Sequence, residues 1–427
     1  SSLHILSSST DNLFSMNSGR IEFVPYQYRP VLKLIKSDRP RLLIADEVGV
    51  GKTIEAGLII KELKARMDLS SVLIICPKPL VSERKWLQEM KRFDEEFVHL
   101  NGEDFRHCMR ETHLDEEWPA QYSKAILPFS LLGSDALFGK EGQRGAVQDE
   151  GLLGLDPPPR FDLVIVDEAH NIRNSDTMLH HGVRFFCDNA QAVVFLSATP
   201  VQLGENDLFT LLNVLRPDIA IDTNTFEHMS APNRFINGAV EAARAAGEDW
   251  QDQARSLLEE VAKTDWGKLS IRETPAFQAI YDKLGEEGVS DDQRVRLVRE
   301  IEELYTFNGL INRTRRRDIG EFTTRKPETL RVDFTESQRE IHDDLLDVVA
   351  RILVACHGQQ NVKFMMTTIR RQAASCLYGL APLLKDILEG QADQLELMIA
   401  SGSDEELDLG SIDEIREDIS LLLQKAN

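Results

Sequence analysis

The sequence is poor in cysteine and has no long apolar run. Five cysteines occur among 427 residues, and none forms a Cys-x-x-Cys pair. This usage excludes a disulfide framework and a zinc ribbon, and it predicts a reducing cytoplasm. The longest apolar runs, such as residues 71–76 and 192–196, are far shorter than the roughly 20 residues of a membrane-spanning helix. We therefore expect no membrane-inserted segment.

Basic residues are scarce relative to acidic ones. The chain has 49 Lys and Arg against 71 Asp and Glu, which gives a formal net charge of −22. Such a charge excludes a surface coated all round by nucleic acid, although it permits a local basic groove. The acidic excess is concentrated in residues 391–427, where ten acidic residues stand against Arg416 and Lys425.

Apolar segments of strand length alternate with helical segments between residues 41 and 216. Strands that are apolar along their whole length are buried on both faces. The pattern therefore predicts an α/β fold, with a parallel sheet that helices cover on both sides. The expected strands are RLLIAD (41–46), SVLIIC (71–76), KAILPF (124–129), DLVIVD (162–167) and AVVFLSA (192–198), with helices over 53–66 and near 82–93.

The rest of the chain departs from this alternation. Residues 1–19 are rich in Ser and Asn, and we expect them to be flexible. Residues 131–160 hold six glycines and three consecutive prolines, which predicts a long mobile loop. A charged helical insertion is expected over 224–310, an Arg-rich connector over 311–340, and further helix with the acidic tail over 341–427.

A glycine-containing turn lies between the first expected strand and the following helix. Gly49 and Gly51 allow the backbone to curl so that amide N–H groups face phosphate oxygens, and the helix N-terminus adds partial positive charge. Lys52 would reach the β- and γ-phosphates of ATP, and the Thr53 hydroxyl would bind Mg²⁺. Asp46 stands where the strict G-x-x-x-x-G-K-[ST] pattern has Gly. The residues expected to bind ATP here are Asp46, Glu47, Val48, Gly49, Val50, Gly51, Lys52 and Thr53.

An acidic pair, Asp167 and Glu168, ends the fourth expected strand. Ligands of parallel α/β sheets bind beside the carboxyl ends of the strands, close to the phosphate loop. Asp167 would hold Mg²⁺, and Glu168 would orient and deprotonate the attacking water. Two adjacent carboxylates at the end of a buried strand are costly without a cation. The expected catalytic residues are therefore Lys52, Asp167 and Glu168.

A third polar segment, Ser197-Ala198-Thr199, ends the next strand. On its own this segment is equally typical of a simple turn. Its position after the acidic pair favours a functional role, because Ser197 and Thr199 can respond to the γ-phosphate and to His170 through hydrogen bonds. We expect these three residues to couple the nucleotide to the rest of the protein.

The three segments resemble motifs I, II and III of superfamily 2 helicases, and their details resemble the Swi/Snf-like branch. ADEVGVGKTIEAGLI (45–59) is similar to the phosphate loop of that branch, which also lacks the first Gly, and its continuation is closest to RapA-like bacterial members. SATPVQLGENDLFTLLNVLRPD (197–218) is similar to the extended motif III. VLIICPKPLVSERKWLQEMKRF (72–93) resembles motif Ia. VPYQYRPVLKLI (24–35) resembles the adenine-recognition motif, with Gln27 as the adenine reader.

This resemblance implies a RecA-like P-loop lobe over residues 20–223, in a motor that binds ATP and Mg²⁺ between two such lobes. Residues 312–319 and 325–341 resemble the Arg-rich passage toward the second lobe, but motifs IV to VI are not recognisable. A second RecA-like lobe or a C-terminal half is therefore an expected partner. Without it, we expect the chain to hydrolyse ATP barely at all, because the facing lobe supplies an arginine to the γ-phosphate.

Members of this family track the phosphate backbone of double-stranded DNA with little sequence preference, and usually without separating the strands. The resemblance implies DNA contacts at Lys78 and at the basic cluster of Arg313, Arg315, Arg316 and Arg317. Simpler interpretations stay open. Lys78 could be an ordinary solvated lysine, and the arginines could form a solvated turn or pair with the acidic helices.

The favoured interpretation is the ATP-binding lobe of a double-stranded DNA translocase in the bacterial cytoplasm, with no membrane partner. One alternative is a strand-separating helicase or restriction-type motor. Another is a catalytically degenerate scaffold, which the intact Lys52, Thr53, Asp167 and Glu168 disfavour. RNA polymerase recycling, chromosome maintenance and antiphage defence all use such motors. Subunits of a DNA-processing or defence system are therefore expected partners, without a choice among the systems.

Overall fold

The computed structural model describes residues 13–17, 24–47, 49–140, 149–198, 204–286 and 288–314, with short stretches between 335 and 347. The chain divides into two compact units, residues 1–324 and 325–427, and nearly all described residues belong to the first. No helix of the described part is long and apolar enough to cross a membrane. Five residues with an expected role lie outside the described part, as does the acidic tail: Val48, Thr199, Arg315, Arg316 and Arg317.

Seven parallel strands form the central sheet, in the order β3-β4-β2-β7-β8-β1-β9. Alternate residues of a strand reach opposite cores: Leu42 and Ile44 face one, and Leu43 faces the other. The predicted α/β class, with the parallel sheet of a RecA-like lobe, is confirmed. The strand bounds are β1 Arg41–Ile44, β2 Val72–Cys76, β3 Val98–His99, β4 Lys124–Pro128, β7 Phe161–Val166, β8 Ala190–Leu196 and β9 Ile311–Asn312.

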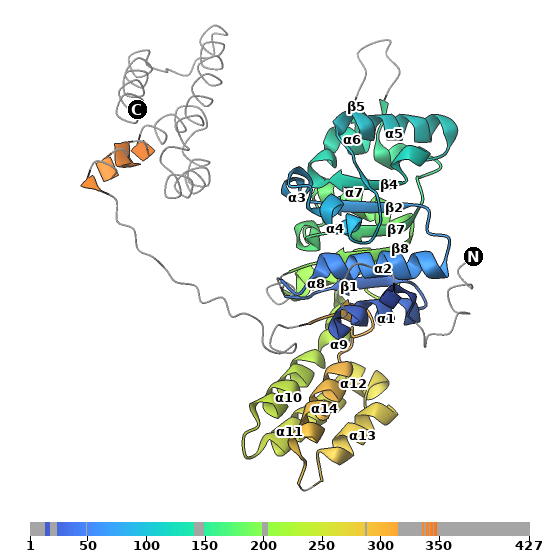
Figure 1. Ribbon diagram of the computed structural model, residues 1–427. Helices are drawn as coiled ribbons and strands as arrows, with labels where there is room; N and C mark the ends of the chain where they lie inside the picture. Colours follow the sequence, from blue (N-terminus) through green and yellow to red (C-terminus); the bar gives the residue numbers. More distant parts are fainter. Residues whose placement is uncertain are drawn as a thin grey trace. The chain divides into compact units, whose positions relative to one another are not determined.

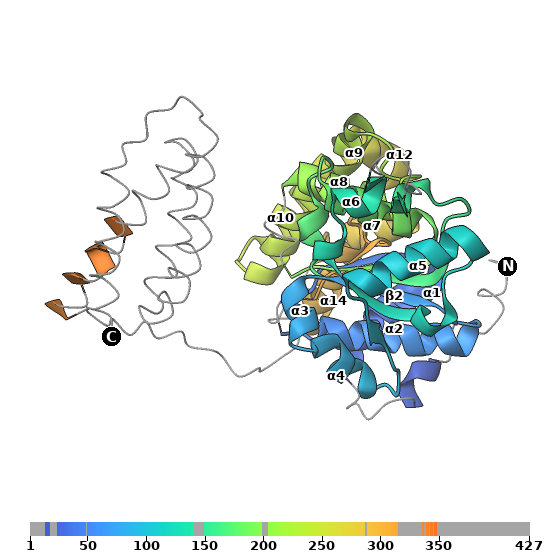
Figure 2. The ribbon, with the colours of Figure 1, turned by 90° about the horizontal axis from the view of Figure 1, so that it is seen from above.

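Helices cover both faces of this sheet (Figures 1 and 2). One face packs against α1 (Arg29–Lys36), α2 (Lys52–Arg66), α3 (Lys78–Ser82) and α4 (Lys85–Lys91). The other face packs against α5 (Gly102–Asp115), α6 (Ser134–Phe138), α7 (Met178–Asp188) and α8 (Glu205–Leu215). Single helical turns complete the lobe: η1 Phe14–Asn17, η2 Pro25–Tyr28, η3 Ala120–Tyr122, η4 Phe129–Leu131, η5 Leu152–Gly154 and η6 Ala169–Ile172.

A group of helices with its own core follows α8 (yellow-green to orange in Figure 1), and the bounds of 224–310 for a helical insertion stay a prediction. Ile236, Leu258 and Ile301 are among its fully buried side chains, which explains why these charged helices hold together. After α14 the chain returns to the sheet as β9, which pairs with β1. The helices are α9 Thr223–Ser230, α10 Asn233–Ala245, α11 Trp250–Lys263, α12 Asp265–Ser270, α13 Pro275–Lys283 and α14 Asp291–Glu303.

The prediction of one long mobile loop over residues 131–160 is wrong for most of that segment. It contains α6, η5 and a small hairpin of β5 (Gly139–Lys140) and β6 (Asp149–Glu150). Leu137, Leu152 and Leu155 are buried in the sheet core, so the apolar residues between the glycines hold the segment in place. The expected helix near 82–93 is present. It is shorter than expected and corresponds to α4, which begins after Arg84, whose φ is +54°, and this turn separates it from α3.

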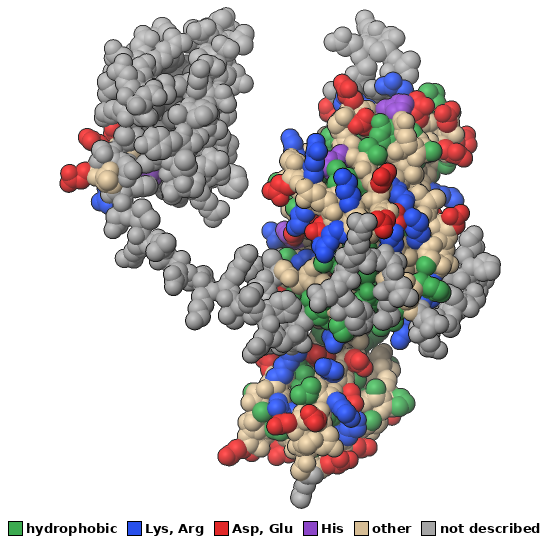
Figure 3. Space-filling model, viewed as in Figure 1, with side chains coloured by type: hydrophobic (Ala, Val, Ile, Leu, Met, Phe, Trp, Pro, Cys, Tyr) green, Lys and Arg blue, Asp and Glu red, His purple; other side chains and the backbone are tan. Residues whose placement is uncertain are grey.

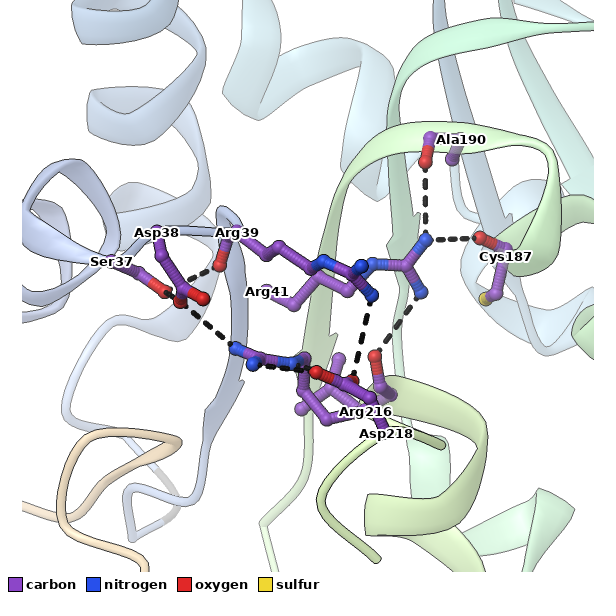
Figure 4. Close-up of polar contacts among 9 residues, drawn as sticks. Ser37, Asp38, Arg39, Arg41, Cys187, Ala190, Arg216 and Asp218 are labelled. Atoms are coloured by element: carbon purple, nitrogen blue, oxygen red, sulfur yellow. Dashed lines mark hydrogen bonds and ion pairs between the residues drawn. The ribbon is translucent and has the colours of Figure 1, made fainter. Parts of the chain in front are cut away.

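Two arginines connect the start of β1 with the end of α8, at the amino end of this strand (Figure 4). Arg41 donates to the carbonyls of Leu215, Cys187 and Ala190, at 3.1, 2.8 and 3.1 Å. Arg216 is buried. It donates to Asp218 at 2.9 Å through Nε and one terminal nitrogen, and its other terminal nitrogen donates to Asp38, just before β1, at 3.3 Å. These contacts satisfy main-chain carbonyls at element ends and fix where α8 meets β1.

Candidate active site

The carboxyl ends of β1, β7 and β8 lie at one edge of the sheet, because all three strands run in the same direction. β8 lies between the other two, with Leu196 opposite Ile44 and Phe195 opposite Val166. The Ser197 N–H then donates to the Ile44 carbonyl at 2.9 Å. The three polar segments singled out in the sequence are thus brought to the edge where parallel sheets bind their ligands.

The loop after β1 is shaped by two glycines. The φ angles of Gly49 and Gly51 are +87° and +105°, in the left-handed region that favours glycine. A Cβ at Gly51 would lie 2.5 Å from Nε2 of Gln27. That nitrogen and the hydroxyl of Tyr26 each donate to the Val50 carbonyl at 3.1 Å. Gln27 therefore supports the loop backbone, and its role as adenine reader stays a prediction.

Lys52 begins α2, and its Nζ donates to the backbone carbonyl of Asp46 at 3.0 Å. Burial lowers the pKa of Lys52, while the charges of Glu168, Asp46 and Asp167 oppose that shift. The lysine of the β1 loop and the acidic pair after β7 therefore share one electrostatic environment. Thr53 is half-buried in the first turn of the same helix.

Asp46 and Glu55 are two fully buried carboxyl groups beside this loop. Oδ1 of Asp46 accepts hydrogen bonds from the Thr314 N–H at 2.7 Å and from the Asn312 amide at 3.2 Å. Burial and the charge of Asp46 raise the pKa of Glu55 well above its ordinary value. The sequence reasoning missed Glu55. The sequence does indicate burial of this residue, because Glu55 lies in the first turn of the expected helix and is followed directly by apolar residues.

The carboxylate of Asp167 is held at both oxygens. Oδ1 accepts from the Glu168 N–H at 2.9 Å, and Oδ2 accepts from the indole Nε1 of Trp86 at 3.0 Å. Burial, followed by the charge of Glu168, raises the pKa of Asp167, whereas the two hydrogen bonds lower it. A carboxylate oxygen has two lone pairs, so each oxygen keeps one for a cation or its water. Trp86 entered the sequence analysis only as part of the motif Ia resemblance.

Glu168 adopts a left-handed conformation, with φ of +50°. Non-glycine residues are uncommon there, and such strain is concentrated at functional sites. Its Oε2 lies 3.3 Å from Nδ1 of His170. Ser197 is fully buried, and its hydroxyl makes no hydrogen bond with any described residue. An unpartnered hydroxyl at the same edge of the sheet as Lys52 and Asp167 fits a polar ligand there. The coupling roles of His170 and Ser197 stay predictions.

Exposed basic side chains follow β2 at the same edge of the sheet. Lys78 begins α3, and Arg84 and Lys85 lie at the turn into α4; all three are exposed. Figure 3 shows Lys and Arg side chains gathered over α2, α3 and α4. Arg313, just after β9, is also exposed. The sequence reasoning singled out Lys78 and Arg313 but missed Arg84 and Lys85.

The sequence of the chain matches one protein family and several curated proteins. The model of the SNF2-related domain family matches residues 26–377. The RNA polymerase-associated protein RapA of Pseudomonas savastanoi pv. phaseolicola is 28% identical over 356 residues, which cover 79% of this chain and 33% of the relative. RapA of Vibrio parahaemolyticus is 27% identical over 324 residues, which cover 74% of this chain and 30% of the relative. The chain thus spans about a third of the length of these curated relatives.

Among solved structures, the chain is similar to the SWI2/SNF2 ATPase core of Sulfolobus solfataricus in complex with double-stranded DNA. The TM-score is 0.36 at 14% sequence identity, and the match covers 68% of this chain and 72% of that one. The SWI2/SNF2 ATPase core domain of the same organism gives a TM-score of 0.35 at 14% identity, with coverage of 70% and 60%.

Proposed function

The chain belongs to the SNF2-related domain family, and from this premise we propose that it is the ATP-binding lobe of a double-stranded DNA translocase. The observation that carries the proposal is the shared electrostatic environment of Lys52, Asp167 and Glu168 at the carboxyl ends of β1 and β7. A structural ion pair would neutralise such a lysine with one partner. Here the ammonium bonds a backbone carbonyl, while several carboxylates act on its pKa through their charge, which suits a site that also receives phosphates and a divalent cation.

Several residues of the site would bind the phosphates of ATP and the Mg²⁺ ion. The amides of the Gly49–Gly51 turn would cradle phosphate oxygens, and Lys52 would exchange its bond to the Asp46 carbonyl for the β- and γ-phosphates. Thr53 and Asp167 would hold Mg²⁺, which neutralises developing phosphate charge when bound.

Three further side chains would act on the water and on the γ-phosphate. Glu168 would take the proton of the attacking water, and its 3.3 Å contact with Nδ1 of His170 would orient it. The free hydroxyl of Ser197 would respond to the γ-phosphate through a hydrogen bond. We assign the same role to Thr199.

The DNA partner is proposed from the basic surface of Lys78, Arg84 and Lys85, with the phosphate backbone as the contact. A second RecA-like lobe would complete the active site and close on the nucleotide. The curated relatives are named for association with RNA polymerase. A polymerase, or subunits of a DNA-processing or defence system, are proposed partners in a bacterial cytoplasm.

Triplex displacement by the complete two-lobed motor tests this function. A translocase displaces the third strand from a duplex with ATP and leaves the duplex paired. Separation of the duplex strands in a parallel assay would instead indicate a helicase. Absence of nucleotide-dependent displacement of any kind would indicate an interaction scaffold. The isolated 427-residue chain serves as the control, with little ATP turnover expected even when duplex DNA is present.

A further inference from the structure

Trp86 is a buried side chain that contacts the candidate active site but has no role in the proposed reaction. Trp86 lies in the first turn of α4, and none of its surface is exposed. Its single polar group, the indole N–H, donates to Oδ2 of Asp167 across 81 residues of sequence. We propose that Trp86 is a positioning residue, which fixes the Asp167 carboxylate in the orientation that binds Mg²⁺. This inference rests on the proposed function.

The geometry of the carboxylate supports a positioning role. With Oδ1 bonded to the Glu168 N–H and Oδ2 bonded to Trp86, rotation of the Asp167 side chain would break a hydrogen bond at one oxygen or the other. Outer partners of this kind commonly orient the ligands of a metal ion. Without the indole N–H, Oδ2 would lose its only hydrogen bond to a described residue, in a buried setting.

Trp86 is itself fixed relative to the phosphate-loop helix. The ring lies in the core beneath α2 and α4, in the same cluster as Phe93. Gly57 of α2 provides the close approach, because a Cβ there would lie 2.2 Å from the Phe93 ring. The segment just after α4 therefore packs closely against α2, which begins with Lys52 and Thr53. Trp86 thus connects the position of the Asp167 carboxylate to that of α2, whose first turn carries Thr53, the other expected Mg²⁺ ligand.

The same chain offers a tryptophan with a purely structural bond. Trp118 packs on the other core, 5.4 Å from the ring of Phe161, and its Nε1 donates to the Tyr122 carbonyl at 3.0 Å. Both tryptophans thus combine core packing with one indole hydrogen bond of equal length. They differ in the acceptor, which is a backbone carbonyl in one case and the Asp167 carboxylate in the other. Trp118→Phe is therefore a matched control for Trp86→Phe.

The test measures binding of a fluorescent ADP analogue to the full chain over a series of Mg²⁺ concentrations, and in EDTA. Trp86→Phe is expected to raise the Mg²⁺ concentration for half-maximal enhancement about tenfold, while affinity in EDTA stays unchanged. Trp118→Phe is expected to leave both quantities unchanged, although it lowers the melting temperature. An unchanged Mg²⁺ midpoint in Trp86→Phe, or an equal shift in Trp118→Phe, would overturn the inference.

The unsubstituted chain separates this failure from a failure of the proposed function. If it binds no nucleotide with or without Mg²⁺, both ideas fall. If it shows Mg²⁺-dependent binding that Trp86→Phe does not alter, only the positioning role falls.

A second measurement covers the case in which Trp86→Phe does not fold. The four tryptophans of the unsubstituted chain can be labelled with 5-fluorotryptophan and observed by ¹⁹F NMR. Variants that replace Trp118, Trp250 and Trp266 one at a time assign the Trp86 signal by elimination. Addition of Mg²⁺ to the ADP-bound chain is expected to shift the Trp86 signal and not that of Trp118. A Trp86 signal that Mg²⁺ leaves in place would overturn the inference.

Discussion

Oδ1 of Asp46 accepts a hydrogen bond of 2.7 Å from the backbone N–H of Thr314, 268 residues later in the chain. Around it, the Ala45 N–H donates to the Asn312 carbonyl at 2.7 Å, and the Glu47 N–H donates to the Thr314 carbonyl at 3.2 Å. The phosphate loop is thus hydrogen-bonded to the segment by which the chain leaves the helical insertion. A change in that segment would act directly on the backbone of the loop.

Asp46→Ala is expected to lower the free energy of unfolding by about 1–3 kcal/mol, because it leaves the buried Thr314 N–H without an acceptor. Asp46→Asn keeps an acceptor oxygen at this place and is expected to cost less. Denaturant unfolding of the three proteins measures the difference. Equal losses for both substitutions would show that the hydrogen bond to Thr314 is not the source of the stability.

Lys52→Ala is expected to weaken binding of an ATP analogue about 10- to 100-fold, because a charge-assisted contact with the phosphates is lost. Lys36→Ala, at the exposed end of α1, should bind the ATP analogue normally.

Glu168→Gln is expected to keep nucleotide affinity but to lower the turnover of the complete motor about 10²–10⁴-fold, since the water loses its base. Equilibrium binding and single-turnover hydrolysis separate these effects, and normal turnover in Glu168→Gln would contradict the assignment of the base.

The sheet and its covering helices were predictable because they are encoded locally. Apolar runs such as residues 71–76 are separated by helical segments, and parallel strands of one direction bring their carboxyl ends together. The order of the polar segments along the chain therefore predicted which side chains lie at one edge. The sequence alone therefore predicts that Lys52 and Asp167 lie in a common site.

The missed features depend on partners far away in sequence. β9 has only two residues, and it becomes a strand because the edge of β1 is open beside it. The link between Trp86 and Asp167 joins two motifs that pattern reading treats separately. Residues 131–160 look like a loop because glycine and proline dominate locally, whereas burial of Leu137 and Leu152 in the common core decides their structure.

Duplex DNA binding is expected to weaken when the exposed cations at the turn between α3 and α4 are removed. Combined Lys78→Ala and Lys85→Ala substitution should reduce affinity to a similar degree for every DNA sequence. It should also lower the slope of log affinity against log salt by roughly one for each lost phosphate contact. Lys263→Ala, exposed in the helical insertion, is the matched control. Fluorescence anisotropy at several salt concentrations measures both quantities, and a sequence-dependent loss would argue against backbone contacts.

Glu95 connects α2 to the sheet that carries the candidate active site, and the effect of acid on this connection can be measured through the stability of the fold. Its side chain is 1% exposed and pairs with Lys61, Lys64 and Lys124 at 3.1, 2.9 and 2.6 Å. Burial alone would raise the pKa of Glu95, but the hydrogen bonds from the three lysines outweigh it and lower the pKa to about 2. The lysines come from α2 and β4, so this carboxylate joins the phosphate-loop helix to the sheet.

The pKa of Glu95 is lower in the folded protein than the ordinary glutamate value of about 4.3, so its ionised form stabilises the fold. That contribution is complete above about pH 5 and is lost as the pH falls from there toward 2. Glu95→Gln is therefore expected to lower the free energy of unfolding by about 2 kcal/mol at pH 7, with a deficit that shrinks below pH 4. Glu96→Gln, the exposed neighbour, should match the unsubstituted chain at every pH. Denaturant unfolding between pH 3 and pH 7 measures the three profiles. A deficit that is the same at both ends of this range would mean that packing, rather than the charge of Glu95, holds these elements together.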